Sequence, residues 1–237
     1  MISSSASPSR PRGRQLMHPR APASSMLEAE RASLLTSVVV TPDSEDWPAE
    51  DLLLRLGVLL DAGVTAVMFR EKRLDDAAFL HLGRRVKDLC DRRGALFWLN
   101  ERIHLQPALN ADLCHLTFRS PDLARAKELL PDHVGVTASV HDVEEGVRRI
   151  QDGLDGVVFG PIFPVPSKKG RVPVQGLEAL RELVRRVSVP VVAIGGMNPE
   201  RLRDVRACGA TGAAAIRFFF ENPHGRRAVE EWRRAWE

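Results

Sequence analysis

The chain has 237 residues, 44% hydrophobic and 27% charged, a composition typical of a globular protein large enough to bury a core without cross-links. Its three cysteines form no CxxC pair, which excludes a disulfide scaffold and predicts reduced thiols in a cytoplasmic protein. The formal charge is +3, but residues 1–27 carry four arginines and no acid, so the remainder is nearly neutral. A nucleic-acid-binding protein is therefore not expected, and no apolar run is long enough for a membrane span.

The first residues differ in composition from the rest. Residues 1–33 are rich in Ser, Pro, Ala and Arg, without periodicity and without the apolar stretch of a secretory signal. Such a segment cannot bury enough apolar surface to offset the entropy lost on ordering. We therefore predict a disordered tail over residues 1–33 and one domain over residues 34–237.

From residue 34 onward, short β-rich runs alternate with longer helical patterns. Strands are predicted at 34–41, 66–71, 95–100, 113–117, 134–139, 156–161, 189–196 and 212–219. Helices are predicted at 48–62, 74–93, 102–109, 121–130, 142–152, 176–187, 198–208 and 222–236. Eight such units, several with wholly apolar strands, indicate a (β/α)8 barrel, with a doubly wound open sheet as the alternative. In a barrel the chemistry lies at the carboxyl ends of the strands.

The second and third strands end in polar residues. Because side chains alternate along a strand, Met68, Arg70 and Lys72 share one face, and the two cations suit an anionic substrate. A solvated charge run, with Glu71 neutralising a neighbour, explains the same residues equally well. Asn100 after the third strand could bind substrate or cap the following helix.

The fifth strand leads through Ser139 to His141, a candidate general acid or base near neutral pH, although a surface histidine is the commoner case. The connection after the sixth strand, residues 160–170, is long and rich in proline, and it contains Lys168. It could close over an anionic ligand or be an ordinary surface loop.

The last two strands carry the features of a phosphate site. Gly195 and Gly196 end the seventh strand just before a predicted helix start, where backbone N–H groups favour an anion. Arg217, at the end of the eighth strand, could clamp a phosphate or fill the space for one.

Taken in order, these residues resemble the thiamine phosphate synthase/TenI family of (β/α)8 barrels. The matching stretches, within residues 34–222, are GVTAVMFREK at 63–72, LNER at 99–102, HL at 115–116, GVTASVH at 135–141, GPIFPVPSKKG at 160–170, GL at 176–177 and VPVVAIGGMNPERLRDV at 189–205. The resemblance implies one of two activities. A synthase joins an aminopyrimidine diphosphate to a thiazole phosphate with the help of Mg²⁺, whereas a TenI-type tautomerase aromatises a thiazole carboxylate phosphate by proton transfer at a histidine after strand 5.

Several synthase positions are altered here. Met68 stands where synthases have Gln, Glu101 where they have a metal-binding Asp, and residues 115–120 (HLTFRS) lack the second metal-binding acid. Arg217 replaces a family Ser, while His141 is kept. Because the losses fall mainly on the diphosphate and metal half of the site, the resemblance favours a TenI-like thiazole tautomerase, an isomerase without a cofactor.

The resemblance then implies the roles of individual residues. His141 and Lys168 would be catalytic, and no residue would bind a metal. Substrate and phosphate would be bound by Arg70, Lys72, Asn100, Ser139, Gly195, Gly196 and Arg217. The expected partner is a small phosphate-bearing molecule, not a nucleic acid or a membrane; a homo-oligomer is left open. Two alternatives also stay open: a divergent synthase that uses Mg²⁺, and a non-catalytic barrel that binds thiazole phosphate or thiamine phosphate.

Overall fold

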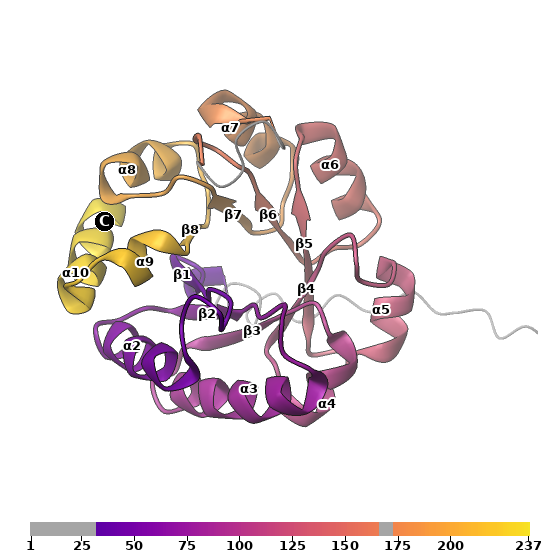
Figure 1. Ribbon diagram of the computed structural model, residues 1–237. Helices are drawn as coiled ribbons and strands as arrows, with labels where there is room; N and C mark the ends of the chain where they lie inside the picture. The colour runs from indigo at the N-terminus through magenta and orange to yellow at the C-terminus, as the bar shows by residue number, and fades with distance from the viewer. Residues whose placement is uncertain (1–31, 166–172) are drawn as a thin grey trace, which may run out of the picture.

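The computed structural model describes residues 32–165 and 173–237 of the chain, so the predicted tail lies almost wholly outside the described residues. Eight parallel strands form a closed barrel in chain order, with β8 pairing back to β1, and helices surround it (Figure 1). This closure confirms the predicted (β/α)8 barrel and rules out the open-sheet alternative. Because every strand is parallel, all eight carboxyl ends open onto one mouth.

The elements follow the predicted order. The strands are β1 (Ser37–Val40), β2 (Ala66–Phe69), β3 (Leu96–Asn100), β4 (Leu113–Leu116), β5 (Gly135–Val140), β6 (Gly156–Phe159), β7 (Val191–Ile194) and β8 (Gly212–Ala215). The helices are α2 (Ala49–Asp61), α3 (Asp76–Asp91), the 3-10 turn η1 (Ile103–Leu105), α4 (Gln106–Leu109), α5 (Leu123–Leu129), α6 (Val143–Gln151), α7 (Gly176–Arg186), α8 (Pro199–Ala207), α9 (Arg217–Glu221) and α10 (Gly225–Trp236). None of the described helices is both long and apolar enough to cross a membrane.

Helix boundaries follow from local chemistry. The Asp75 carboxylate accepts the backbone N–H of Ala78 at 2.8 Å and so caps α3, as its position predicts. Gly94, with φ +63°, follows α3 in the left-handed conformation that favours glycine. Asn198 occupies the predicted N-cap position of α8, but its side chain makes no capping hydrogen bond.

The prediction for the eighth strand is wrong at its carboxyl end. β8 stops at Ala215, and residues 217–221 form the short helix α9 instead of extending the strand to residue 219. A helical turn buries the side chains of both Phe219 and Phe220, whereas a strand would point these two neighbours to opposite faces. Phe219 packs 4.8 Å from the Trp232 ring of α10, and Phe220 packs 5.1 Å from Trp47.

Alternating side chains divide the apolar core into two layers. Along β3, Leu96 and Trp98 point into the barrel, while Phe97 and Leu99 pack outward against the helices. Met68 of β2 likewise faces the interior. This alternation places the polar residues that continue the inward face of each strand at the mouth.

Candidate active site

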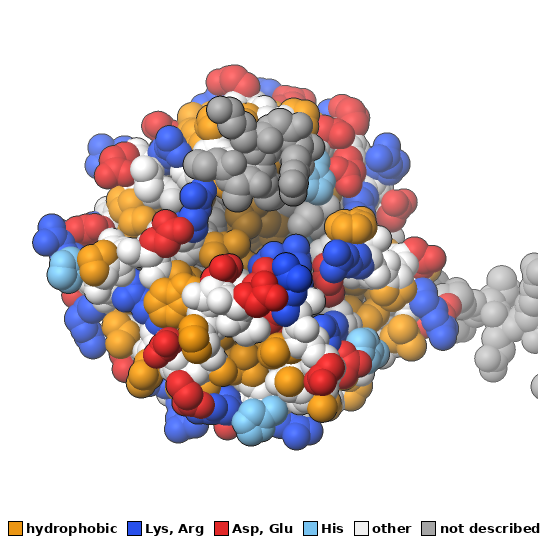
Figure 2. All heavy atoms as spheres, in the orientation of Figure 1, with side chains coloured by type: hydrophobic (Ala, Val, Ile, Leu, Met, Phe, Trp, Pro, Cys, Tyr) orange, Lys and Arg blue, Asp and Glu red, His pale blue; other side chains and the backbone are white. Residues whose placement is uncertain are grey.

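The barrel mouth gathers the ends of strands that lie far apart in the sequence. Figure 2 shows a central hollow with hydrophobic side chains in its depth and charged side chains beside it. Among the described residues predicted for the site, Arg70 and Asn100 follow or end β2 and β3, Ser139 lies in β5, and Gly195 follows β7. Lys168, predicted to be catalytic, lies outside the described residues.

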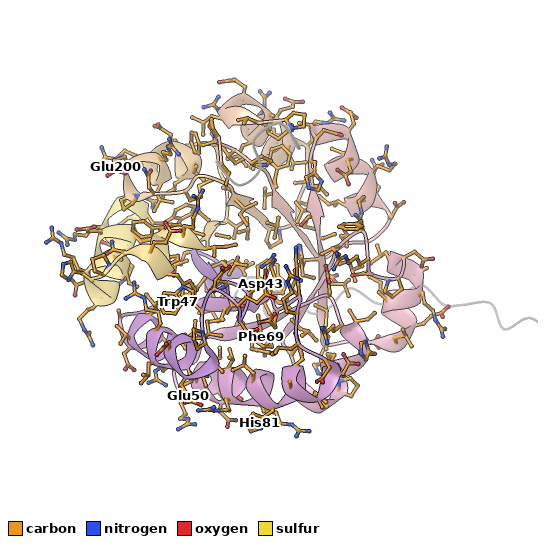
Figure 3. The ribbon with its side chains drawn as sticks, viewed as in Figure 1. Asp43, Trp47, Glu50, Phe69, His81 and Glu200 are labelled. Carbon is orange, nitrogen blue, oxygen red and sulfur yellow. The ribbon has the colours of Figure 1, made fainter. Side chains whose placement is uncertain are left out.

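Arg70 pairs with an acid that sequence reasoning missed. Its Nη1 and Nη2 atoms lie 3.4 and 3.5 Å from the two carboxylate oxygens of Asp43, a residue of the loop after β1. Asp43 Oδ1 also accepts the backbone N–H of Lys72 at 3.1 Å. Asp43 lies beside the barrel opening in Figure 3. The Asp43 carboxylate thus holds the side chain of Arg70 and the backbone of Lys72 at the end of β2.

The electrostatics at Lys72 favour an anionic ligand. Desolvation of the ammonium group is the main cause that lowers the pKa of Lys72, and the positive charge of Arg70 lowers it further. The charge of Asp43 acts in the opposite direction, toward a higher pKa. A phosphate placed between the two cations would relieve their repulsion.

Glu71 links the loops after β1 and β2 by hydrogen bonds. It is buried, with 5% of its surface exposed, and accepts the backbone N–H groups of Ser44 at 2.6 Å and Arg73 at 2.8 Å. Glu71 therefore does not neutralise Arg70 or Lys72, which was one interpretation of the sequence. Thr41 adds two hydrogen bonds of 2.8 Å between its hydroxyl and the backbone of Arg70. The first two βα loops are thus joined through a buried carboxylate.

The end of β3 is a strained corner. Asn100 is buried at the inward-facing end of the strand, and Glu101 and Arg102 adopt positive φ angles of 59° and 37°. The Glu101 carboxylate accepts the hydroxyl of Thr117 at 2.7 Å. Arg102 turns outward to Asp76 of α3, with 2.5 Å between Nη1 and Oδ1. The corner leaves the Asn100 amide beside the mouth.

A histidine that was not among the predicted site residues lies inside the barrel. His115 of β4 is 2% exposed, with Nδ1 3.0 Å from Thr137 Oγ1 and Nε2 2.9 Å from Ser139 Oγ. Burial, with a smaller contribution from the charge of Arg149, lowers the pKa of His115 to about 3. The alternation of residues 113, 115 and 117 along β4 was the signal that could have placed it inside.

His141 directly follows β5, as predicted, but its side chain is exposed. Its Nδ1 lies 3.6 Å from Glu145 Oε2, and the same carboxylate oxygen accepts the backbone N–H of His141 at 2.8 Å. Glu145 belongs to the first turn of α6. The Glu145 carboxylate thus lies beside the imidazole, and its hydrogen bond goes to the backbone of His141.

The glycine pair after β7 packs against the loop after β6. A Cβ atom on Gly195, which has φ +100°, would lie 2.6 Å from Pro161 Cβ, and one on Gly196 would lie 2.9 Å from Phe163 Cβ. Arg201 of α8 donates to the Gly196 carbonyl and stacks 4.6 Å from the Phe163 ring centroid. The backbone N–H groups of both glycines find no acceptor among the described residues. As far as the described residues go, both groups are therefore available to an anion.

Arg217 lies just beyond the eighth strand. It opens α9, directly after the turn at Ile216, and its side chain is exposed. A separate groove of about 490 Å³ lies on the outer face of α2, lined by Trp47, Leu54 and neighbouring residues. Figure 3 shows Trp47 between α2 and α9, away from the barrel opening. That groove contains none of the predicted site residues.

The described residues do not fit a metal site held by the protein alone. They contain no group of three or more His, Cys, Asp or Glu side chains placed to hold an ion. Glu101 offers one carboxylate, already hydrogen-bonded to Thr117, and the loop after β4 presents Phe118 and Arg119 where a second acid would be needed. Mg²⁺ prefers six oxygen ligands, so we assign no step to this ion.

Known proteins with similar sequences and folds identify the family. A family model described as thiamine monophosphate synthase matches residues 37–219. The chain is 35% identical over 178 residues to the thiamine-phosphate synthase of Pyrococcus horikoshii, covering 75% of this chain and 85% of that protein. It is 34% identical over 195 residues to that of Archaeoglobus fulgidus, covering 82% and 90% of the two chains.

A solved structure agrees with these sequence relatives. The thiamine phosphate pyrophosphorylase of Pyrococcus furiosus superposes with a TM-score of 0.79 at 30% sequence identity, covering 87% of this chain and 97% of that one. The resemblance inferred from the sequence motifs is confirmed: this chain belongs to the thiamine phosphate synthase/TenI family.

Proposed function

We propose that this enzyme of thiamine biosynthesis is a thiamine phosphate synthase. The observation that carries the proposal is the likeness to relatives named thiamine-phosphate synthase along most of both chains. It supports the transferase alternative better than the thiazole tautomerase that the sequence interpretation favoured. The altered motif positions then mark a divergent site within the synthase group.

In the proposed reaction, the ring nitrogen of the thiazole phosphate uses its lone pair to form a C–N bond with the methylene carbon of the aminopyrimidine diphosphate. The C–O bond to the diphosphate breaks, and its electron pair leaves with pyrophosphate. Negative charge thus grows on the leaving group. Arg70 and Lys72, fixed around Asp43, would bind this group and stabilise that charge.

The second substrate would bind at the opposite side of the mouth. The N–H groups of Gly195 and Gly196, which have no acceptor among the described residues, would hold the phosphate of the thiazole, with the exposed Arg217 beside β8 as a further cation. Asn100 and Ser139, on strands between these two sites, would contact the substrates bound there. Holding both substrates at these sites brings the nucleophile close to the methylene carbon.

The tautomerase remains a second candidate because of one feature of the site. His141 follows β5 at the mouth, and the Glu145 carboxylate lies 3.6 Å from its imidazole. An imidazole placed in this way can remove one proton and deliver another near neutral pH. Lys168, proposed earlier as a second catalytic residue, stays a prediction.

A turnover assay separates the candidate functions. We expect pyrophosphate release when both synthase substrates are supplied. The assay is run in parallel with and without Mg²⁺. Arg70→Met should lower kcat/KM at least about 10-fold, the effect of losing a hydrogen bond to a charged group. Arg84 is an exposed arginine of α3, so Arg84→Met is the matched control and should leave kcat/KM unchanged.

Other outcomes would replace the proposal. Aromatisation of the thiazole precursor without the pyrimidine, together with a loss of about 100-fold or more in His141→Gln, would establish the tautomerase. Tight binding of thiazole phosphate with neither reaction would favour the non-catalytic barrel.

A further inference from the structure

Four polar side chains form a continuous chain of hydrogen bonds inside the barrel. Trp98 Nε1 donates to Thr137 Oγ1 at 3.0 Å, Thr137 Oγ1 lies 3.0 Å from His115 Nδ1, and His115 Nε2 lies 2.9 Å from Ser139 Oγ. Trp98, His115 and Thr137 are 1%, 2% and 4% exposed, whereas Ser139 is half-buried. The chain therefore runs from the dry interior to one partly open hydroxyl.

The barrel register fixes this chain in place. His115 of β4 lies directly beside Thr137 of β5 and beside Asn100 of β3, and all three side chains continue the inward face of their strands. The rings of Trp98 and His115 meet edge-on, with their centroids 5.7 Å apart. Packing and hydrogen bonds at both ring nitrogens thus hold the imidazole in one orientation.

Counting protons limits the directions of these hydrogen bonds. Trp98 can only donate, so Thr137 Oγ1 accepts from it and has one proton to give. Two acceptors are within reach: His115 Nδ1 at 3.0 Å and the Cys114 carbonyl at 3.3 Å. The shorter contact favours the imidazole nitrogen. His115 then carries its own proton on Nε2 and donates it to Ser139 Oγ.

The direction of the last hydrogen bond decides what Ser139 offers to the mouth. An oxygen that accepts from His115 keeps its own proton for another partner. With the opposite tautomer, Ser139 would give that proton to Nε2 and present only lone pairs. Since Arg70 and Lys72 prepare the mouth for an anion, a hydroxyl donor is the complementary group there.

We propose that His115 is a positioning residue that holds the Ser139 hydroxyl as a hydrogen-bond donor to the anionic substrate. The inference rests on the proposed function, because it assumes that a substrate with phosphate oxygens reaches Ser139. The arrangement uses the neutral ring, in which Nδ1 accepts from Thr137 and Nε2 donates to Ser139. The burial that lowers the pKa of His115 to about 3 keeps it neutral in the working range.

Two substitutions at one position test the mechanism. The amide of His115→Gln can reach the place of Nε2 and donate to Ser139, whereas that of His115→Asn reaches only the place of Nδ1. We expect His115→Asn to lower kcat/KM of the synthase reaction about 10- to 100-fold and His115→Gln to recover most of the loss. Equal losses in the two variants, which both remove the imidazole from the core, would overturn the proposal.

A double-mutant cycle supplies a second criterion. If His115 acts through the Ser139 hydroxyl, His115→Asn should cost little once Ser139→Ala has removed that hydroxyl. Calorimetry with inorganic pyrophosphate should show the same non-additivity in Kd, without any need for turnover. Losses that multiply in the double variant would refute a shared role.

The imidazole tautomer can be measured in the full-length chain. Long-range ¹H–¹⁵N NMR of the wild type should show a neutral His115 ring protonated at Nε2 from about pH 5 to 9, well above its lowered pKa. A neutral ring protonated at Nδ1 would overturn the inference even if the variants fail to fold. If the wild type makes no thiamine phosphate but shows the Nε2 tautomer and the pyrophosphate coupling, only the proposed function fails.

Discussion

The guanidinium of Arg70 and the carboxylate of Asp43 face each other across the loops after β2 and β1, with oxygen–nitrogen distances of 3.4 and 3.5 Å. About a fifth of each side chain is exposed, so water screens the pair only partly. Asp43 therefore restrains Arg70 and also competes with an incoming anion for it. The two effects can be separated by substitution.

Asp43→Asn should tighten the binding of inorganic pyrophosphate about 2- to 5-fold at low salt, because it removes the competing charge but keeps an oxygen for the N–H of Lys72. Calorimetry at about 50 and about 500 mM salt should show the gain shrinking as the charges are screened. Asp51→Asn, which removes an exposed charge on α2, controls for net charge. Weaker binding by Asp43→Asn would show that restraint of Arg70 outweighs competition.

Glu71→Ala should lower the free energy of unfolding by about 1 to 3 kcal/mol, since it leaves the backbone N–H groups of Ser44 and Arg73 without their acceptor. Glu71→Gln keeps one of the two acceptor oxygens and should lose less. Urea denaturation measures both values. Equal stability of Glu71→Ala and the wild type would mean that water replaces the carboxylate.

Gly195→Ala should both destabilise the fold and weaken binding of a phosphate ligand, because its Cβ would press on Pro161 at 2.6 Å. Gly94→Ala is the matched control: its φ is also positive, at +63°, but a Cβ there meets nothing within 4 Å. We expect Gly94→Ala to cost about 1 kcal/mol of stability, as for other non-glycine residues at positive φ, without changing affinity. Denaturation and calorimetry on both variants give the comparison. Unchanged ligand affinity in Gly195→Ala would remove the glycine pair from the phosphate site.

The buried His115 predicts a pH dependence of stability. Its pKa is lowered from 6.5 to about 3, so between these values the unfolded chain binds a proton that the native chain does not. The free energy of unfolding should then fall as the pH falls through this window, with this group contributing at most about 1.4 kcal/mol per pH unit.

Replacing the histidine isolates that contribution. His115→Gln should show a shallower loss of stability below about pH 6.5, whereas His81→Gln should follow the wild type because His81 is exposed on α3 (Figure 3). Chemical denaturation at several pH values gives the three curves. Parallel curves for His115→Gln and the wild type would contradict a buried neutral imidazole.

Much of the architecture could be predicted from local patterns. Alternating apolar runs and capping residues such as Asp75 depend on near neighbours in the chain, so the strands, the helices and the barrel are encoded locally. The parallel closure then requires Arg70, Asn100, Ser139 and Gly195 to meet at one mouth. The carboxyl end of the eighth strand could not be predicted in this way, because the packing of Phe219 on Trp232 depends on the distant helix α10.

The sequence by itself determined the barrel, the family and the set of strand-end residues, because periodicity and motif spacing are properties of consecutive residues. Only the tertiary structure decided which of these side chains meet. Asp43 reaches Arg70 from 27 residues away, and His115 reaches Ser139 from 24 residues away. The physical reason is that barrel closure and register bring together side chains from different strands and loops, and these distances are not encoded in any local pattern.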